Sequence, residues 1–120
     1  YAHDVNAQIA SLTQVGQLDV THWIPGHGVL TGHDAIADTL AINHQAIATS
    51  KTMVTAACGN GASLQQVVAT VQQSLGVTSS AMAQYAVFAS GISAYLSALH
   101  ADGVVTVELG ADGPMWRAVA

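Results

Sequence analysis

Hydrophobic residues recur at helical spacing in the first half of the chain. One such stretch covers residues 3–15 and stops before Gly16, a residue common at helix ends. A second, longer helix is predicted to begin near residue 34, with Asp34 or Thr31 as its N-cap, and to end at Cys58 before Gly59. The apolar positions are Val5, Ile9, Leu12 and Val15 in the first helix and Ile36, Leu40, Ile47 and Val54 in the second.

Two more helices are predicted in the second half. Ser63 is a good N-cap for a helix that runs to about Leu75, and Ser79 or Ser80 for one that ends at Asp102-Gly103. Gly91 lies inside the last helix, at a cost of roughly 1 kcal/mol against Ala, which indicates a close helix contact or a weak point. The apolar faces comprise Leu64, Val67, Val68, Val71 and Leu75, then Tyr85, Phe88, Ile92, Tyr95, Leu96 and Leu99.

Short strands complete the pattern. Leu18–Ile24 is a strand candidate that ends at Pro25-Gly26-His27-Gly28, and Val104–Leu109 and Met115–Val119 form a hairpin with the four-residue loop Gly110-Ala111-Asp112-Gly113. No strand is predicted between the long helix and the helix after Ser63. We therefore expect a mainly α fold with a small β component. Three helices followed by a hairpin, over residues 51–120, is the order of a winged helix, a variant of the helix-turn-helix module.

Composition excludes several classes of function. The chain has 120 residues, 51% hydrophobic and 8% charged, which suits one domain or two small ones that share a core. Lys51 and Arg117 are its two basic residues against seven acidic ones, so nucleic acid and anionic membranes are not expected partners. Cys58 is the single cysteine, which excludes a disulfide scaffold. No signal-peptide or membrane-spanning pattern is present, so we expect a cytoplasmic protein.

The sharpest local motif is Ile24-Pro25-Gly26-His27-Gly28. It places a histidine at the end of a strand, in a turn where flanking glycines let the backbone approach an ion closely. Imidazole is the commonest protein metal ligand. A histidine that merely sits beside a turn is the alternative interpretation.

The order of elements around this motif resembles the closing segment of the metallo-β-lactamase fold. Many members have a helix, a short strand that ends in Pro-Gly-His-Gly, and a long helix with a His-Arg pair, matched here by His44-Gln45. In one branch a winged-helix domain follows. The resemblance implies that residues 1–50 are the end of an αββα fold and that residues 51–120 are a winged-helix-like domain with a C-terminal β-hairpin.

The resemblance also implies a site. His27 corresponds to a ligand of one of two metals, usually zinc, in hydrolases that attack an ester, thioester or lactone of a small-molecule substrate with metal-bound hydroxide. The family's main motif, His-x-His-x-Asp-His, precedes the turn and does not occur in this chain. One histidine cannot hold a catalytic zinc, which needs about three protein ligands. We therefore expect the C-terminal part of a hydrolase, inactive alone, whose partner is its N-terminal part or another chain, with a homodimer possible. Gln45, where the family has Arg, puts that position's role in doubt.

Other chemistry-bearing residues have simpler interpretations. A self-contained site of His22, His27 and His33 is disfavoured by their spacings of 5 and 6. Asp34 and Asp38 are expected to be helix-dipole partners rather than a carboxylate pair. The remaining residues singled out are His44 at an interface or on the surface, His3 and His100 in solvent, Cys58 as a buried hydrophobe, Trp23 and Trp116 as core or interface aromatics, and Tyr85, Phe88 and Tyr95 as core residues.

Two other functions stay open at this point. The chain could be a standalone winged-helix interaction or dimerisation module, with the Pro-Gly-His-Gly turn coincidental. A DNA-binding regulator is the weakest hypothesis, because the candidate recognition helix, Ser80–Ala101, contains no Lys or Arg.

Overall fold

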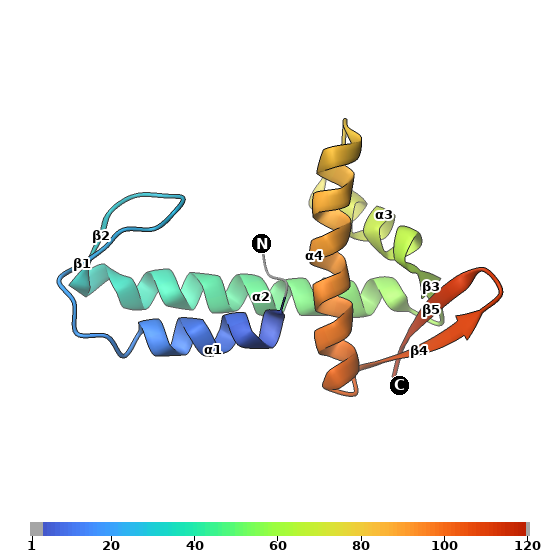
Figure 1. Ribbon diagram of the computed structural model, residues 1–120, viewed down its shortest axis with the longest axis horizontal. Coiled ribbons are helices and arrows are strands. Elements are labelled where there is room, and N and C mark those ends of the chain that lie inside the picture. Colours follow the sequence, from blue (N-terminus) through green and yellow to red (C-terminus); the bar gives the residue numbers. More distant parts are fainter. Residues whose placement is uncertain (1–3, 120) are drawn as a thin grey trace.

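A computed structural model of the chain describes residues 4–119, and its longest element is helix α2. This helix runs from Ile36 to Cys58, 23 residues, and so spans about 34 Å. The molecule measures 54 × 33 × 19 Å along its principal axes. Helix α1 (Val5–Val15) lies antiparallel beside the first half of α2, and helix α4 (Met82–Ala101) crosses its second half (Figure 1).

The first predicted helix is confirmed as α1, although residue 3 lies outside the described residues. Asp4 is its N-cap and accepts a hydrogen bond from the Ala7 N–H at 2.9 Å. The helix ends at Gly16, as predicted. Val5 is the buried residue of this helix. It packs with Ile47 of α2 and with Ala94 and Ala98 of α4 in a small core that is separate from the main one.

The strand predicted at Leu18–Ile24 is mostly wrong. Only His22–Trp23 forms a strand, β1, which pairs antiparallel with β2 (Thr31–Gly32). The residues before it pair with no strand and make local hydrogen bonds instead: the Leu18 N–H donates to Val15 O and the Val20 N–H donates to Leu18 O. These hydrogen bonds bend the backbone away from an extended conformation.

The start of α2 also differs from the prediction. Thr31 belongs to β2 and Asp34 to a 3₁₀ turn, η1 (His33–Ala35), so that the N-cap is Ala35, which makes no side-chain capping bond. The predicted end at Cys58 is confirmed, and Gly59 follows it with φ +46°. The chain passes from the β1–β2 hairpin through η1 directly into α2, and no side chain caps the start of the helix.

Helix α3 (Leu64–Leu75) begins as the sequence predicts. The Ser63 hydroxyl accepts from the Gln66 N–H at 3.3 Å while Gln66 Oε1 accepts from the Ser63 N–H at 2.8 Å, a reciprocal capping box. The predicted cap of α4 is wrong. Its N-cap is Ala81, because Ser80 instead donates its N–H and its hydroxyl to Gln84 Oε1.

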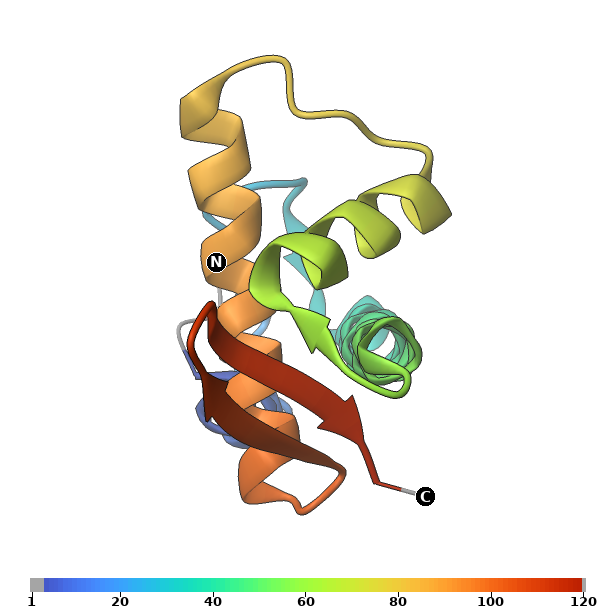
Figure 2. The same cartoon turned by 90° about the vertical axis from the view of Figure 1, so that its right-hand side faces the viewer.

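A three-stranded antiparallel sheet closes the second half. The predicted hairpin is confirmed as β4 (Val105–Gly110) and β5 (Gly113–Ala118), but the loop between them has two residues rather than four, because Gly110 and Gly113 pair with each other. An unpredicted strand, β3 (Ala62–Ser63), pairs with β5 and gives the order β3-β5-β4. Figure 2 shows this sheet beside α3 and α4.

The main core lies between α2, α3, α4 and the sheet. Its buried residues are Val54, Cys58, Ala62, Val67, Val68, Val71, Ile92, Leu96, Leu99 and Val105, with Tyr85, Phe88, Tyr95 and Trp116 packed against them. The expected mainly helical fold with a small β component is confirmed. Among residues 4–119, no helix is long and apolar enough to cross a bilayer.

Candidate functional site

The Pro-Gly-His-Gly motif lies in a loop that the two paired strands close. His22 pairs with Gly32 and Trp23 with Thr31, and the chain between them, residues 24–30, forms the loop beside the first half of α2 (Figure 1). Gly28 has φ +116°, a conformation that side-chain-bearing residues rarely adopt. The glycine after His27 is therefore required by the backbone of the turn.

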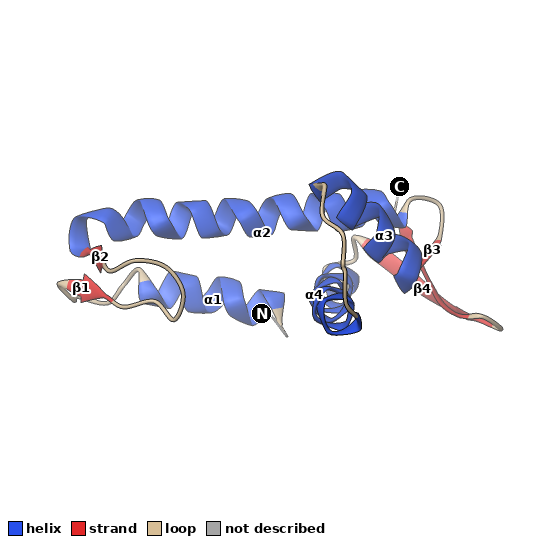
Figure 3. Cartoon of the chain, turned by 90° about the horizontal axis from the view of Figure 1, so that it is seen from above, coloured by secondary structure: helices blue, strands red, loops and turns tan. Residues whose placement is uncertain are grey.

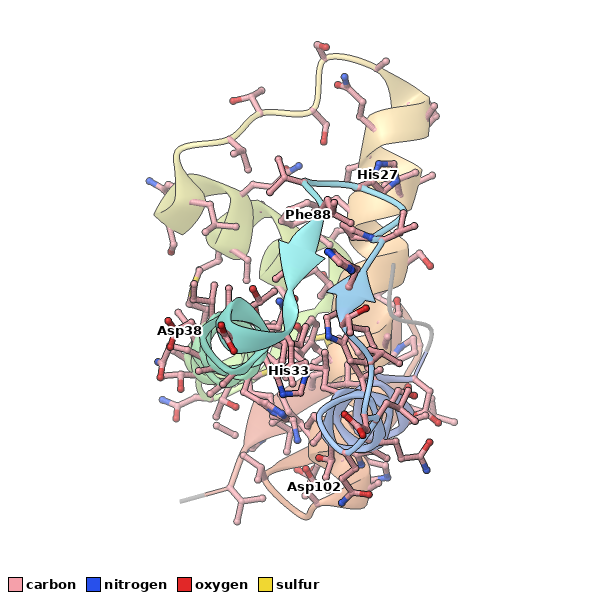
Figure 4. The ribbon with its side chains drawn as sticks, turned by 90° about the vertical axis from the view of Figure 1, so that its left-hand side faces the viewer. His27, His33, Asp38, Phe88 and Asp102 are labelled. Carbon is pink, nitrogen blue, oxygen red and sulfur yellow. The ribbon has the colours of Figure 1, made fainter. Side chains whose placement is uncertain are left out.

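His27 is exposed and lines a cavity of about 440 Å³. Its walls come from the loop, from Leu12 and Val15 of α1, and from α2, which contributes Leu40 and Asn43 among others. Figure 4 labels His27 on the loop that leads into α2, away from the start of the helix where Asp38 is labelled. This placement makes the imidazole available to a ligand in the cavity.

Two polar residues of α2, Thr39 and Asn43, line the same cavity and were missed by sequence reasoning. The Thr39 hydroxyl donates to Ala35 O at 3.1 Å and the Asn43 amide donates to Thr39 O at 2.8 Å, so both side chains are held against the helix backbone. Their i, i+4 spacing was the available signal, because it puts both on one helix face.

The other two histidines of the N-terminal part do not join His27. His33 Nδ1 lies 2.9 Å from Val20 O, and the His33 N–H donates to Thr21 O, so this residue fixes the entry to β1. His22 Nδ1 lies 3.0 Å from the Thr21 hydroxyl. Within residues 4–119, no group of three or more His, Cys, Asp or Glu side chains could hold a metal ion. The described residues therefore do not form a complete metal centre.

The remaining candidates from the N-terminal half lie on or beside α2 and do not line the His27 cavity. His44 is half-buried on α2, while Gln45 is exposed and donates to the Thr49 hydroxyl at 3.3 Å. Asp34 and Asp38 are exposed at the start of α2. The helix dipole places partial positive charge at this end, which stabilises the two carboxylates. Figure 4 labels Asp38 and His33 on these elements.

Three residues of the C-terminal half belong to packing. Cys58 is buried, as predicted, and burial raises the pKa of its thiol. His100 is exposed as expected, but its Nδ1 lies 3.1 Å from Val105 O and its ring meets Trp116 edge-on, with centroids 6.2 Å apart. Trp116 packs against the main core.

The His27 loop carries unusually exposed apolar side chains. Ile24 is 88% exposed, Val29 80% and Leu30 63%. Trp23, which precedes Ile24 in the chain, has a buried Nε1 that lacks a hydrogen-bond partner among the described residues. An exposed apolar patch of this kind is typical of a surface that contacts another part of a protein.

Comparison with known proteins gives a likeness of fold. No protein family and no curated protein matches the sequence. A crystal structure of a beta-lactamase domain protein from Burkholderia ambifaria matches 98% of this chain with a TM-score of 0.73 and 21% sequence identity. The chain spans 34% of the length of that protein. At this identity the match shows that the two share a fold over the aligned part.

Proposed function

We propose that this chain is the C-terminal part of a metal-dependent hydrolase of the metallo-β-lactamase superfamily. In this proposal His27 supplies one ligand, through an imidazole nitrogen, to a zinc centre whose other ligands come from upstream sequence. The substrate is an ester, thioester or lactone. The observation that carries the proposal is the exposed His27, on a glycine-dependent loop, in a chain that shares its fold with part of a beta-lactamase domain protein.

The surface of the loop supports a larger assembly. Ile24 and Val29 flank the motif and are almost fully exposed, and Trp23 Nε1 is buried without a partner among the described residues. Packing against a further part of the same hydrolase would bury the two aliphatic side chains and offer the indole N–H an acceptor.

The second half supports the winged-helix part of the proposal. The elements follow the order α2-β3-α3-α4-β4-β5, and the strands of the sheet lie in the order β3-β5-β4. Strand β3, which lies between α2 and α3 in the sequence, therefore pairs with the C-terminal hairpin. The proposed domains, residues 1–50 and 51–120, meet within α2, so this helix links the ligand loop to the helical domain. That domain would shape the substrate pocket or a dimer.

Metal analysis of the full-length gene product tests the proposal. We expect a mass above 12.2 kDa, bound zinc, and hydrolysis of a simple aryl ester. His27→Ala should lower zinc affinity and activity by more than about tenfold, because loss of a ligand costs at least as much as loss of a residue that orients one. His22→Ala is the matched control, since His22 is exposed on the adjacent strand and should leave both unchanged.

Equal zinc content and activity in the two variants would contradict the role of His27. The second candidate function is a standalone interaction module, which the compact core between α2, α3, α4 and the sheet favours. It predicts a native mass near 12.2 kDa and a dimer that is indifferent to metal chelation in sedimentation equilibrium.

A further inference from the structure

A second cavity lies between α2, α3 and α4, away from the histidine loop. Its volume is about 260 Å³, larger than the ~150 Å³ apolar cavities that take up benzene in other proteins. The lining is almost wholly apolar and includes Met53 of α2, Leu75 of α3, and Val87 and Phe88 of α4. Leu75 and Val87 are about half exposed, so solvent reaches the cavity between them.

Gly91 keeps this cavity open. It lies in the middle of α4 and lines the cavity, yet a Cβ built on it would meet nothing within 4 Å. No close helix contact therefore requires glycine here, and its backbone does not adopt positive φ. A glycine in a helix interior costs about 1 kcal/mol relative to alanine. Glycine therefore leaves space at the cavity wall that a larger side chain at this position would occupy.

The cavity and the His27 loop lie along one face of α2. Thr39 and Asn43 line the His27 cavity, whereas Ser50 and Met53 line the apolar one. With Ala46 between them, these positions are spaced by four and three residues, which puts them on one helix face. Asn43 and Ser50 are two turns apart, about 10.5 Å along the axis. Figures 1 and 3 both place the loop and the first half of α4 on the same side of α2.

We infer that the cavity between α2, α3 and α4 binds an unbranched apolar chain, such as the acyl part of a carboxylic ester or thioester. The apolar lining offers no charged group to a polar ligand, and Ala46, which lies between the two cavities on this face of α2, is small and exposed. The use of this cavity as an acyl subsite of the His27 centre rests on the proposed function. Binding of the chain itself needs no metal.

Calorimetric titration of the metal-free full-length gene product with straight-chain carboxylates, from butanoate to decanoate, tests the inference. Affinity should rise by about threefold to fourfold for each added methylene, as expected for burial of apolar surface. Gly91→Leu fills the cavity and should weaken decanoate binding by more than about tenfold. Ala86→Leu adds the same side chain to the exposed surface of α4, outside the cavity, and should leave affinity within about twofold.

A second variant keeps the inference testable if Gly91→Leu fails to fold. Val87→Glu places a carboxylate at the half-exposed edge of the cavity and should also weaken decanoate binding, with the circular dichroism of the wild type retained. Absence of binding at every chain length, or equal affinities for Gly91→Leu and Ala86→Leu, would overturn the inference. A dimer that Gly91→Leu abolishes and that decanoate does not affect would also overturn the inference, because the cavity would then be part of a dimer interface. Because these titrations use no metal, they can succeed even where the His27 experiment fails.

Discussion

Lys51 Nζ lies 2.8 Å from Oδ2 of Asp102 and joins the middle of α2 to the end of α4. Asn6 of α1 extends this contact, because its side chain lies 3.4 Å from both Lys51 Nζ and Asp102 Oδ1. Figure 4 labels Asp102 at this end of the molecule. The three polar residues therefore connect the same three helices that meet in the small core around Val5.

This contact predicts a pH dependence of stability. The hydrogen bond from Lys51 holds the pKa of the Asp102 carboxyl below its ordinary value. A carboxyl with a lowered folded pKa stabilises the fold above its unfolded pKa of about 3.9, and the effect is lost as the pH falls through the folded value. Asp102→Asn should therefore lower the urea midpoint at pH 7, and the difference from wild type should shrink towards pH 2.

The other ion pair provides the control for that experiment. Arg117 and Glu108 are 3.9 Å apart and well exposed, so Glu108→Gln should change the urea midpoint little. Equal effects of Asp102→Asn and Glu108→Gln at pH 7 would show that the Lys51–Asp102 contact has no special role.

The capping box of α3 predicts a specific loss of stability. Ser63→Ala removes the hydroxyl that accepts the Gln66 N–H, and should lower the free energy of unfolding by about 1 kcal/mol. Ser74→Ala is the matched control within the same helix, because the Ser74 hydroxyl only donates to Thr70 O and should change stability by less than about 0.5 kcal/mol. Urea denaturation followed by circular dichroism measures both, and equal losses would contradict the capping role.

Gly91→Ala should stabilise the protein. Alanine is the better helix former by about 1 kcal/mol, and its Cβ would meet nothing within 4 Å at this position. Thermal unfolding should show a higher midpoint. A lower midpoint would mean that α4 needs glycine for a close contact.

Gly76→Ala is the comparison for that substitution. Gly76 also has open space around a built Cβ, but it ends α3 with φ +65°. The left-handed conformation should cost alanine roughly 1–2 kcal/mol, so the two glycine substitutions should shift the thermal midpoint in opposite directions.

The helices and the hairpin were predictable from sequence because each has a local signal. Ser63 and Gln66 mark the start of a helix, and the glycines after the helices mark their ends. These boundaries are determined by hydrogen bonds between residues a few positions apart. Strand β3 was not predictable: two residues carry no periodicity, and their pairing with β5 depends on contacts more than 50 residues away. The predicted Ser79 or Ser80 cap failed for a local reason, because the Gln84 side chain takes both donors of Ser80.

The candidate site was predictable only in part. The turn around His27 is set by Gly28, whose positive φ is a local requirement, and the structure places the motif in a closed loop. Whether His27 binds a metal stays a prediction. The i, i+4 spacing of Thr39 and Asn43 shows that they share a helix face, but it does not assign them to the site, because the cavity exists only where the loop folds back against α2. The winged-helix assignment also stays a prediction.

Cys58 should be chemically inert while the protein is folded. It is 1% exposed at the end of α2, and burial raises the pKa of its thiol, so less of the reactive thiolate forms at a given pH. Reaction with Ellman's reagent at pH 8 should therefore be slow in buffer and complete in urea above the unfolding midpoint. Gly91→Ala should slow the reaction in buffer further if labelling requires global unfolding, since it lowers the population of the open state. Rapid labelling in buffer, unaffected by Gly91→Ala, would show instead that the end of α2 opens locally, without loss of the core around Val54 and Leu96.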